Sequence, residues 1–423
     1  MSGLVKDNVF DSSGTVAAAA GGLSWDTAVV TGSTVTVEAG NGYFINTTSN
    51  ACTITLPSSA EAGDQIILID YLRTWGDNAI TIDSNGLTFQ GDSDAFTVDY
   101  DTAGQSINLV YADSTNGWIP TSDITNAFDH GNPLTQKAIF GFGYTSGDAY
   151  TAITNLVNSS GVVASDTSGV GTARGQIAAA TYGVDKAIFG YGSGYSSVTN
   201  LVNNSGVVGS DVSGVGTARA GLGAAGYGND KAIFAYGKAS PYYSISNLVS
   251  NVGVVGTDVT GVGTARRFPA AATYGADKAI FGFGYVDGGP STGVTNLVSN
   301  VGVVASDVSA VGSARSFLGA AAYGTDKAIF AYGYKSDDSL TSLSNLVSNS
   351  GVVASDVSGV GSARRNLAGT SYGGDKAIFG YGTTGSITGI TNLVNNSGVI
   401  ASDVSGVGTT RDVLAAAGYS SAA

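Results

Sequence analysis

One short phrase, KAIF followed by a small residue, an aromatic residue and glycine, constrains this chain more than any other feature. It occurs six times, and its lysine falls at Lys137, Lys186, Lys231, Lys278, Lys327 and Lys376. The copies are therefore 45–49 residues apart. Such a period indicates one supersecondary unit that is repeated, because each copy buries its apolar face only against its neighbours.

Four more positions recur in register with the lysine. They are an asparagine (Asn155, Asn200, Asn247, Asn296, Asn345, Asn392), an aspartate (Asp166, Asp211, Asp258, Asp307, Asp356, Asp403), an arginine (Arg174, Arg219, Arg266, Arg315, Arg364, Arg411) and a tyrosine (Tyr182, Tyr227, Tyr274, Tyr323, Tyr372, Tyr419). The repeat length is that of a four-stranded propeller blade.

Each repeat contains four short strand candidates, AIFGYG, TNLVN, GVVASD and the AAA(T/G)YG segment. All four are bounded by Gly, Asn, Asp or Ser, which are turn residues. YGxDK reads as a tight hairpin turn between the last and the first of them. Helix is disfavoured because glycine and β-branched residues recur throughout.

The spacing within a repeat indicates where the variable loops lie. Each asparagine is followed by the next lysine after 31 residues, whereas lysine and asparagine are separated by 18, 14, 16, 18, 18 and 16 residues. The differences are even, and an even change keeps side chains on their faces of a hairpin. We therefore expect one variable loop per blade, all six on the same side of a ring.

The ends of the repeat region predict how the ring closes. The first repeat lacks the R…AAA strand and the last lacks the KAIF strand. A complete blade therefore forms if the last segment, Arg411–Tyr419, lies beside the first, Lys137–Tyr144. Closure removes exposed strand edges. The predicted fold is all-β, with a six-bladed, four-stranded β-propeller over residues 137–423 behind an N-terminal β-domain.

Composition and charge exclude several classes of protein. With 63 Gly and 12% charged residues, the chain suits a β protein rich in turns. A net charge of −14 argues against nucleic acid, and no run is long enough to insert in a membrane. Cys52 reads as a core residue. The N-terminus has no secretion signal, so we expect synthesis in a cytoplasm.

The first third of the chain has a different pattern. Residues 1–30 read as an attachment or linking segment, 31–122 as a small antiparallel β-domain, and 123–136 as a linker. The phrases GYFINT, TITLPSS, AGDQIILID, ITIDSNG and LVYADSTNGW resemble a small β-domain of bacteriophage tail fibres and other virion appendages. The resemblance implies a homotrimer, since such a thin domain has little core of its own.

The repeat region, 137–423, resembles the kelch family of propellers. The features it shares are a glycine-rich strand, a loop, an N-x-V strand and an arginine before the next blade, with GYG or GFG in place of the paired glycines of kelch blades. The resemblance implies the architecture rather than the partners of that family. The alanine-rich strands indicate crowded packing near the ring axis.

The residues that could take part in catalysis do not form the pattern of an enzyme site. A residue that recurs six times in one position is typical of blade architecture, so we expect an Asp–Arg brace or a turn contact in each repeat. His130, the one histidine, falls in the linker, and DSNG at 83–86 and the acidic stretch 92–101 read as ordinary turns rather than calcium sites. We expect no catalytic site, metal or cofactor.

The variable loops carry the candidate binding residues. Tyrosines in loops on a rigid scaffold suit saccharide or protein surfaces. The ligand-binding candidates are Tyr150, Tyr195, Lys238, Tyr242, Tyr243, Asp287, Asp337 and Asp338. Asp337 and Asp338 are adjacent in sequence, an arrangement that rarely places two carboxylates across a sugar as glycosidases require.

These observations and the resemblance together favour a structural protein of a bacteriophage virion, assembled in the host cytoplasm. The N-terminal segment would contact other virion proteins, and the propeller would bind a bacterial surface glycan or protein receptor. The alternatives are a capsid-decorating head fibre, a tail-collar component and, less favoured, a polysaccharide-degrading tail enzyme.

Overall fold

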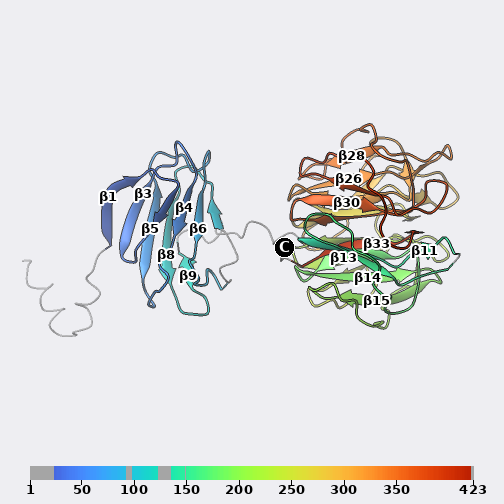
Figure 1. Cartoon of the computed structure of the whole chain (residues 1–423), viewed down its shortest axis with the longest axis horizontal. Helices are drawn as coiled ribbons and strands as arrows, with labels where there is room; N and C mark the ends of the chain where they lie inside the picture. Colours follow the sequence, from blue (N-terminus) through green and yellow to red (C-terminus); the bar gives the residue numbers. More distant parts are fainter. Residues whose placement is uncertain (1–22, 92–97, 122–134, 148, 421–423) are drawn as a thin grey trace, which may run out of the picture. The chain divides into compact units, whose positions relative to one another are not determined.

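A computed structural model describes residues 23–91, 98–121, 135–147 and 149–420. Every regular helix or strand within those ranges is a β-strand. The chain divides into two compact units, residues 1–130 and 131–423, which are called here the N-terminal unit and the repeat unit (Figure 1).

The N-terminal unit is built of two sheets. The five-stranded sheet has the order β1-β3-β5-β8-β9 and comprises β1 (Ser24–Val30), β3 (Asn41–Ile45), β5 (Gln65–Asp70), β8 (Ser106–Tyr111) and β9 (Trp118–Pro120). The four-stranded sheet has the order β2-β4-β6-β7 and comprises β2 (Thr34–Thr36), β4 (Cys52–Thr55), β6 (Ile80–Asp83) and β7 (Val98–Tyr100).

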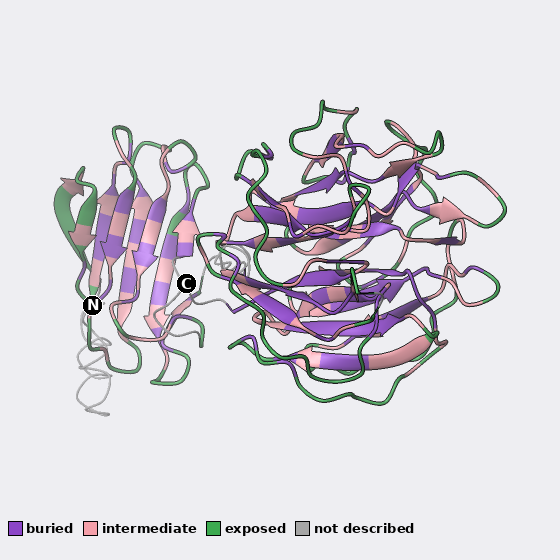
Figure 2. Ribbon diagram, turned by 45° about the vertical axis from the view of Figure 1, so that its right-hand side comes forward, coloured by how far each residue is buried: buried purple, intermediate pink, exposed green. Residues whose placement is uncertain are grey.

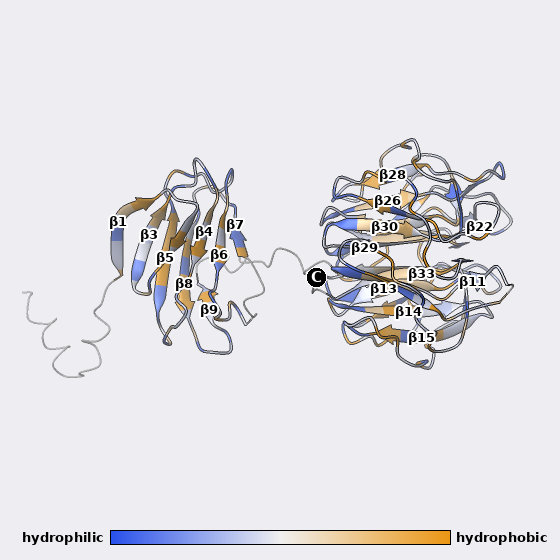
Figure 3. Ribbon diagram, in the orientation of Figure 1, coloured by the Kyte–Doolittle hydropathy of each residue, from blue (hydrophilic) through white to orange (hydrophobic). Residues whose placement is uncertain are grey.

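The two sheets face each other across one core. Alternate residues of β4, β5, β6 and β8 are buried, which appears as bands along the strands in Figure 2 and matches the hydropathy bands of Figure 3. Trp75 and Trp118 are fully buried in this core. Cys52 belongs to the same core, as the sequence predicts, and burial raises the pKa of its thiol.

Two expectations for this unit are wrong. The expected antiparallel domain is instead mixed, since β1–β3, β3–β5, β2–β4 and β4–β6 pair in parallel. The first six strands alternate between the sheets, so the chain returns to each sheet in the same direction. The unit also begins before residue 31, because β1 lies within the segment assigned to attachment and pairs with β3.

The repeat unit contains six three-stranded sheets, each with an inner, a middle and an outer strand (Figure 1). The inner strands are β13 (Ala178–Tyr182), β16 (Gly223–Tyr227), β20 (Ala270–Tyr274), β25 (Gly319–Tyr323), β29 (Ala368–Tyr372) and β33 (Ala415–Tyr419). The middle strands are β14 (Lys186–Gly192), β17 (Lys231–Ala235), β21 (Lys278–Gly282), β26 (Lys327–Ala331), β30 (Lys376–Gly380) and β10 (Lys137–Gly141). The outer strands are β15 (Ser196–Val202), β18 (Ser246–Val249), β23 (Thr295–Val298), β28 (Ser344–Val347), β31 (Thr391–Val394) and β12 (Thr154–Val157).

One sheet is assembled from both ends of the repeat region, as the sequence predicts. β33 pairs antiparallel with β10, and Lys137 lies opposite Tyr419. Inner strands contact one another in the cyclic order β13, β16, β20, β25, β29, β33, and β33 contacts β13. The six sheets therefore form a closed cycle of neighbours.

The predicted fourth strand does not form as a regular strand. The GVVASD segment joins the outer strand only by isolated bridges, such as Val157 with Val163 and Thr154 with Thr167. The two bridges are four residues apart on the segment, at Val163 and Thr167, but three apart on the strand, at Val157 and Thr154. The extra residue interrupts the ladder as a β-bulge does. The side chain of Asn155 fills the break by donating to the carbonyl of Ala164 at 2.9 Å.

The hairpin turns between inner and middle strands form a ring of hydrogen bonds at one end of the axis. The amides of Gly183, Gly228, Gly275 and Gly324 each donate to the carbonyl of the aspartate in the next turn, at 2.6–2.7 Å. The ring closes through Gly373 to Gln136 at 3.0 Å and Ser420 to Asp185 at 2.7 Å. The chain thus enters the repeat unit at this end.

The variable loops lie at the other end of the strands. Three of them begin with short strands that pair with the segment after the recurring arginine: β11 (Tyr144–Thr145) with β32 (Arg411–Asp412), β22 (Tyr285–Val286) with β19 (Arg266–Arg267), and β27 (Tyr334–Lys335) with β24 (Arg315–Ser316). β11 and β22 lie at the same end of the unit in Figure 3. We call this end the loop face.

Candidate binding face of the repeat unit

The six recurring arginines are structural. Each is 0–2% exposed, and each lies between two neighbouring sheets. Arg219 shows the arrangement: its Nε donates to the carbonyl of Tyr236 at 2.7 Å, one terminal nitrogen to the carbonyl of Thr217 at 3.0 Å and the other to Oδ1 of Asn247 at 2.8 Å. Its guanidinium also lies 4.5 Å from the ring centroid of Tyr191, in the preceding sheet.

The expected Asp–Arg brace is present, but asparagine mediates it. Asn247 donates to Oδ1 of Asp258 at 2.9 Å, and Asp258 accepts from the amide and the hydroxyl of Thr217 at 3.0–3.1 Å and 2.6 Å. Direct arginine–aspartate approaches are long, at 4.0 Å for Arg174–Asp211 and 3.6 Å for Arg315–Asp356. The brace therefore links one repeat to the next chiefly through hydrogen bonds.

Burial shifts the pKa values of the groups in this network. Loss of water around the guanidinium lowers the pKa of Arg174 and of Arg315 to about 10, which still leaves both charged at neutral pH. Burial works against the charged form of Asp258, but hydrogen bonds from Thr217 and Asn247 outweigh it and lower the pKa of that carboxyl. These arginines and the aspartate are thus charged at neutral pH.

The residue two positions after each arginine surrounds the axis on the loop face. These six residues, which we call the axial collar, are Gln176, Gly221, Phe268, Phe317, Asn366 and Val413, and all have a positive φ of 45–61°. Backbone N–H groups of the collar donate to the preceding collar carbonyl at 2.6–3.0 Å in five of the six steps. At the remaining step the rings of Phe268 and Phe317 lie 4.2 Å apart.

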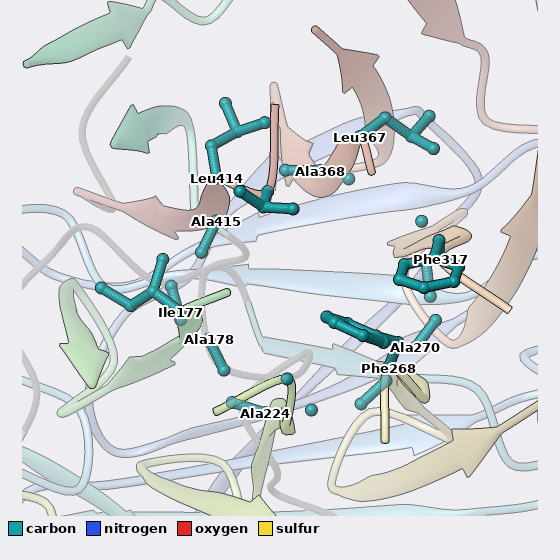
Figure 4. A pocket seen from close by; sticks show the side chains of 18 of the residues that line it. Ile177, Ala178, Ala224, Phe268, Ala270, Phe317, Leu367, Ala368, Leu414 and Ala415 are labelled. Carbon is teal, nitrogen blue, oxygen red and sulfur yellow. The ribbon is translucent and has the colours of Figure 1, made fainter. Parts of the chain in front are cut away.

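The collar borders a cavity of about 110 Å³ on the axis. Deeper in, the cavity is lined by alanines and glycines of the inner strands, including Ala178, Ala224, Ala270 and Ala415. Figure 4 shows Ile177, Leu367 and Leu414 around the same hollow as Phe268 and Phe317. Small residues thus line the axis, as the sequence predicts, but they border a cavity there rather than the crowded packing that was expected. The residue type at the collar differs between repeats, whereas the inner-strand residues that line the deeper part of the cavity are small in every repeat.

Basic and aromatic side chains gather on one sector of the loop face, beside the cavity. The Arg267 guanidinium lies 5.2 Å from the ring centroids of Phe268 and Tyr285 and 5.5 Å from that of Tyr242. The Arg365 guanidinium lies 4.6 Å from the ring of Tyr334 and 6.0 Å from that of Phe317. We call this set the basic–aromatic cluster; its members are Lys238, Tyr242, Arg267, Phe268, Tyr285, Phe317, Tyr334 and Arg365.

Four of the residues predicted from sequence lie in or beside this cluster. The ammonium of Lys238 lies 5.5 Å from the ring centroid of Tyr242. Tyr242 is buried rather than exposed, and burial raises the pKa of its hydroxyl. The charge of Arg267 acts against this rise, and Asp287 and Tyr195 add to it. The variable loops of three neighbouring repeats thus contribute to one site.

The other predicted residues lie apart from these four or at the edge of the cluster. Tyr150 is 45% exposed and its ring lies 5.2 Å from Tyr144, beside the last sheet. Tyr243 is half-buried. Asp338 is exposed and accepts from the hydroxyl of Tyr334 at 2.8 Å, while Asp337 lies 3.2 Å from Lys335.

Sequence reasoning missed Arg267, Phe268, Phe317 and Arg365. They follow the recurring arginine directly in RRFP, RSFL and RRNL, where other repeats have RGQI, RAGL and RDVL. The variation at these two positions could have revealed them. The segment has a constant length in all repeats, so its length gives no sign that it carries variable residues.

The remaining observations concern metal sites, membrane-spanning helices and the acidic segments of the N-terminal unit. Within residues 23–91, 98–121, 135–147 and 149–420 there is no group of three or more His, Cys, Asp or Glu placed to hold a metal, nor a helix long and apolar enough to span a membrane. DSNG forms a turn in which Asp83 accepts from the amide of Asn85 at 2.9 Å. His130 and residues 92–97 of the acidic stretch lie outside the described residues.

No protein-family model matches the chain, and no curated protein matches it either.

Proposed function

We propose that this chain is a structural protein of a bacteriophage virion, a tail fibre or similar appendage, that adheres to the bacterial surface through the loop face of its repeat unit. In this proposal the repeat unit is a six-bladed, kelch-like β-propeller. It binds a surface glycan or protein receptor and has no enzymatic activity.

The propeller assignment is supported by the cyclic order of the six inner strands and by the pairing of β33 with β10. The ring of hydrogen bonds at the hairpin turns supports it as well, and so do the hydrogen bonds in five of the six steps of the axial collar. Each blade would consist of three strands and the bridged GVVASD segment.

One observation carries the adhesion proposal: variation between the repeats is concentrated on one face of the unit. The buried arginine, asparagine and aspartate are the same in all six repeats, whereas the collar residues and the loops between lysine and asparagine differ. Rigid scaffolds with variable loops at one end are typical of recognition proteins. Gln136, near the first described residue of the repeat unit, lies at the opposite end, where its carbonyl accepts from the amide of Gly373.

The virion assignment rests on the resemblance of residues 31–122 to the small β-domain of tail fibres. The virion assignment explains why the chain would have a separate β-unit N-terminal to a recognition unit. Several copies on one particle would also multiply weak contacts with a surface.

A homotrimer is part of the proposal, and the N-terminal unit offers a surface for it. Trp25 and Tyr71 are 42% and 49% exposed, and both have ring contacts with Phe44, at 5.1 Å and 6.2 Å between centroids. Such a row of exposed aromatic residues on the edge of a sheet is typical of an interface between copies.

We expect light scattering of the full chain to give three times the chain mass of 42.1 kDa. The double variant Trp25→Ser, Tyr71→Ser should shift the mass toward that of one chain, because it removes the apolar contact area. A variant of an exposed tyrosine of the repeat unit, Tyr195→Ser, serves as control and should keep the trimer mass. A wild-type chain that is monomeric at micromolar concentration would contradict the trimer.

Immunogold labelling of intact particles with an antibody against the repeat unit tests the virion assignment. We expect gold on the tail or its fibres. Gold spread over the head would favour a capsid-decorating head fibre, and gold at the neck a tail-collar component. Absence of gold from particles, with the protein free in the lysate, would overturn the assignment.

A further inference from the structure

We propose that the basic–aromatic cluster binds an acidic saccharide, with sugar carboxylates held by Arg267 or Arg365 and a sugar ring against the Phe268–Phe317 pair that lies between the two arginines. The inference names the ligand class of the adhesion site, so it rests on the proposed function.

The distribution of positive charge is the first argument. The repeat unit has only four basic residues outside the recurring lysine and arginine positions, namely Lys238, Arg267, Lys335 and Arg365. All four lie on the loop face, in consecutive repeats, and three of them contact rings of the cluster. In a chain of net charge −14, such a concentration of cations favours an anionic ligand.

The state of the two arginines is the second argument. Among the ion pairs formed within the described residues, none includes Arg267, Arg365 or Lys238. The buried Nε of Arg267 has no hydrogen-bond partner there. Both residues are half-buried, and aromatic rings lie against their guanidinium groups. Arg365 also hydrogen-bonds the hydroxyl of Tyr334, but neither arginine is used in an ion pair in the part of the chain that the structure describes. A carboxylate matches that planar fork.

The aromatic pair supplies a surface for the sugar. Phe268 and Phe317 lie between the two arginines, with an angle of 34° between their rings. Both residues also line the axial cavity, so an apolar surface continues from the pair toward the axis. Such a surface suits the C–H face of a pyranose ring, and the flanking tyrosine hydroxyls suit its hydroxyl groups.

The nearby carboxylates favour a ligand of low charge density. Asp337 is paired with Lys335 and Asp338 accepts from Tyr334, but Asp287 is exposed close to Tyr242. These three groups repel a phosphate monoester, which carries about 1.5–2 negative charges at neutral pH, more than a carboxylate of single charge. A uronate or similar sugar is therefore the better match.

One further carboxylate borders the cluster. Asp412 is buried and accepts from Nδ2 of Asn366, the residue after Arg365, at 3.0 Å and from the hydroxyl of Thr383 at 2.7 Å. Asp412 thus has partners within the protein, and it forms no ion pair with Arg365 among the ion pairs of the described residues.

The test measures binding of the full chain to surface polysaccharide purified from the host, native and after carbodiimide-activated borohydride reduction. That treatment converts carboxylates into neutral alcohols and leaves phosphates in place. We expect the native polymer to bind, and the reduced polymer and the double variant Arg267→Ala, Arg365→Ala each to bind at least about tenfold more weakly, the effect of losing a charged hydrogen bond. The matched control Lys278→Ala, Lys376→Ala removes two charges at the opposite end and should bind as the wild type does.

Binding of whole host cells by the same variants separates this inference from the proposed function. If the wild type binds cells but the arginine variant binds them equally well, or if the reduced polymer binds as tightly as the native one, the acidic-saccharide site is wrong and the adhesion proposal stands. If removal of phosphate groups alone from the polymer abolishes binding, the ligand is a phosphorylated polysaccharide and not one that binds through carboxylates. A folded wild-type chain that binds neither cells nor polymer overturns both.

Discussion

A chain that ends at residue 410 should fail to fold its repeat unit. The truncation removes β32 and β33, and with them the five-residue pairing to β10 and the hydrogen bond of 2.7 Å from Arg411 to Asn155. The apolar contacts of Leu414, Ala417 and Tyr419 are also lost. Stability of a domain is only about 5–15 kcal/mol, and loss of one complete inner strand from a closed cycle exceeds it.

The three tryptophans make this loss easy to assign to one unit. Trp25, Trp75 and Trp118 all belong to the N-terminal unit, so their fluorescence reports on that unit, and far-ultraviolet circular dichroism includes the repeat unit. We expect the truncated chain to keep the tryptophan transition and to lose the second cooperative transition. It should also aggregate, because β10 becomes an exposed edge.

A sequence exchange is the matched control for the truncation. Residues Arg411–Tyr419 are replaced by RAGLGAAGY, the sequence of Arg219–Tyr227, which keeps glycine where Gly418 lies against Thr135. This variant restores an inner strand and should regain the second transition. Ring closure would be contradicted by a truncated chain that unfolds with the same cooperativity and midpoint as the full chain.

Arg219→Ala should reduce the free energy of unfolding of the repeat unit by about 3–5 kcal/mol, as expected when one partner of a buried charged network is removed. The variant leaves the carbonyls of Tyr236 and Thr217 and the amide oxygen of Asn247 without their donor. It also removes the cation that lies over the ring of Tyr191. Urea denaturation followed by circular dichroism gives the value.

Lys278→Ala is the control for this prediction. Lys278 is a recurring basic residue too, but its side chain is 43% exposed and pairs with Asp277 at 2.7 Å at the surface. Surface pairs contribute at most about 1 kcal/mol, so the control should unfold close to the wild type. Equal stabilities of the two variants would show that the buried arginine is not a link between sheets.

Much of the fold could be predicted from the sequence because the repeat supplies six copies of one pattern. The strands, the hairpin at YGxDK and the pairing of β33 with β10 all follow from period and alternation. Parallel pairing in the N-terminal unit could not be predicted, since alternation shows which face is buried and not which strand lies beside it. The bulge at Asn155 was missed because a side chain replaces backbone partners there.

The backbone of the GYG and GFG segments was also beyond sequence reasoning. Their aromatic residues, such as Phe142 and Tyr191, have φ of 63° and 65°, a conformation that bulky residues rarely adopt. The carbonyl of Tyr191 accepts from Arg174 at 2.8 Å and its ring faces Arg219. Two arginines from different repeats thus stabilise a conformation that the local sequence disfavours.

The candidate site could be predicted only in part, for a reason of distance along the chain. Tyrosines in the variable loops were identified. Phe268 and Arg365, however, are nearly a hundred residues apart and both contact Phe317 only because the repeats are arranged in a cycle. A position that varies within a constant framework carries the signal. The variation at the position two residues after the recurring arginine becomes informative only once the structure shows that this position faces the axis.

The most direct test of adhesion through the loop face is competition for adsorption. Host cells are incubated with the folded full chain, and the fraction of particles that then adsorb is measured. We predict that the wild-type chain reduces adsorption in proportion to its concentration, and that the Arg267→Ala, Arg365→Ala variant does so far more weakly. Undiminished adsorption at a saturating concentration of wild-type chain would contradict the account.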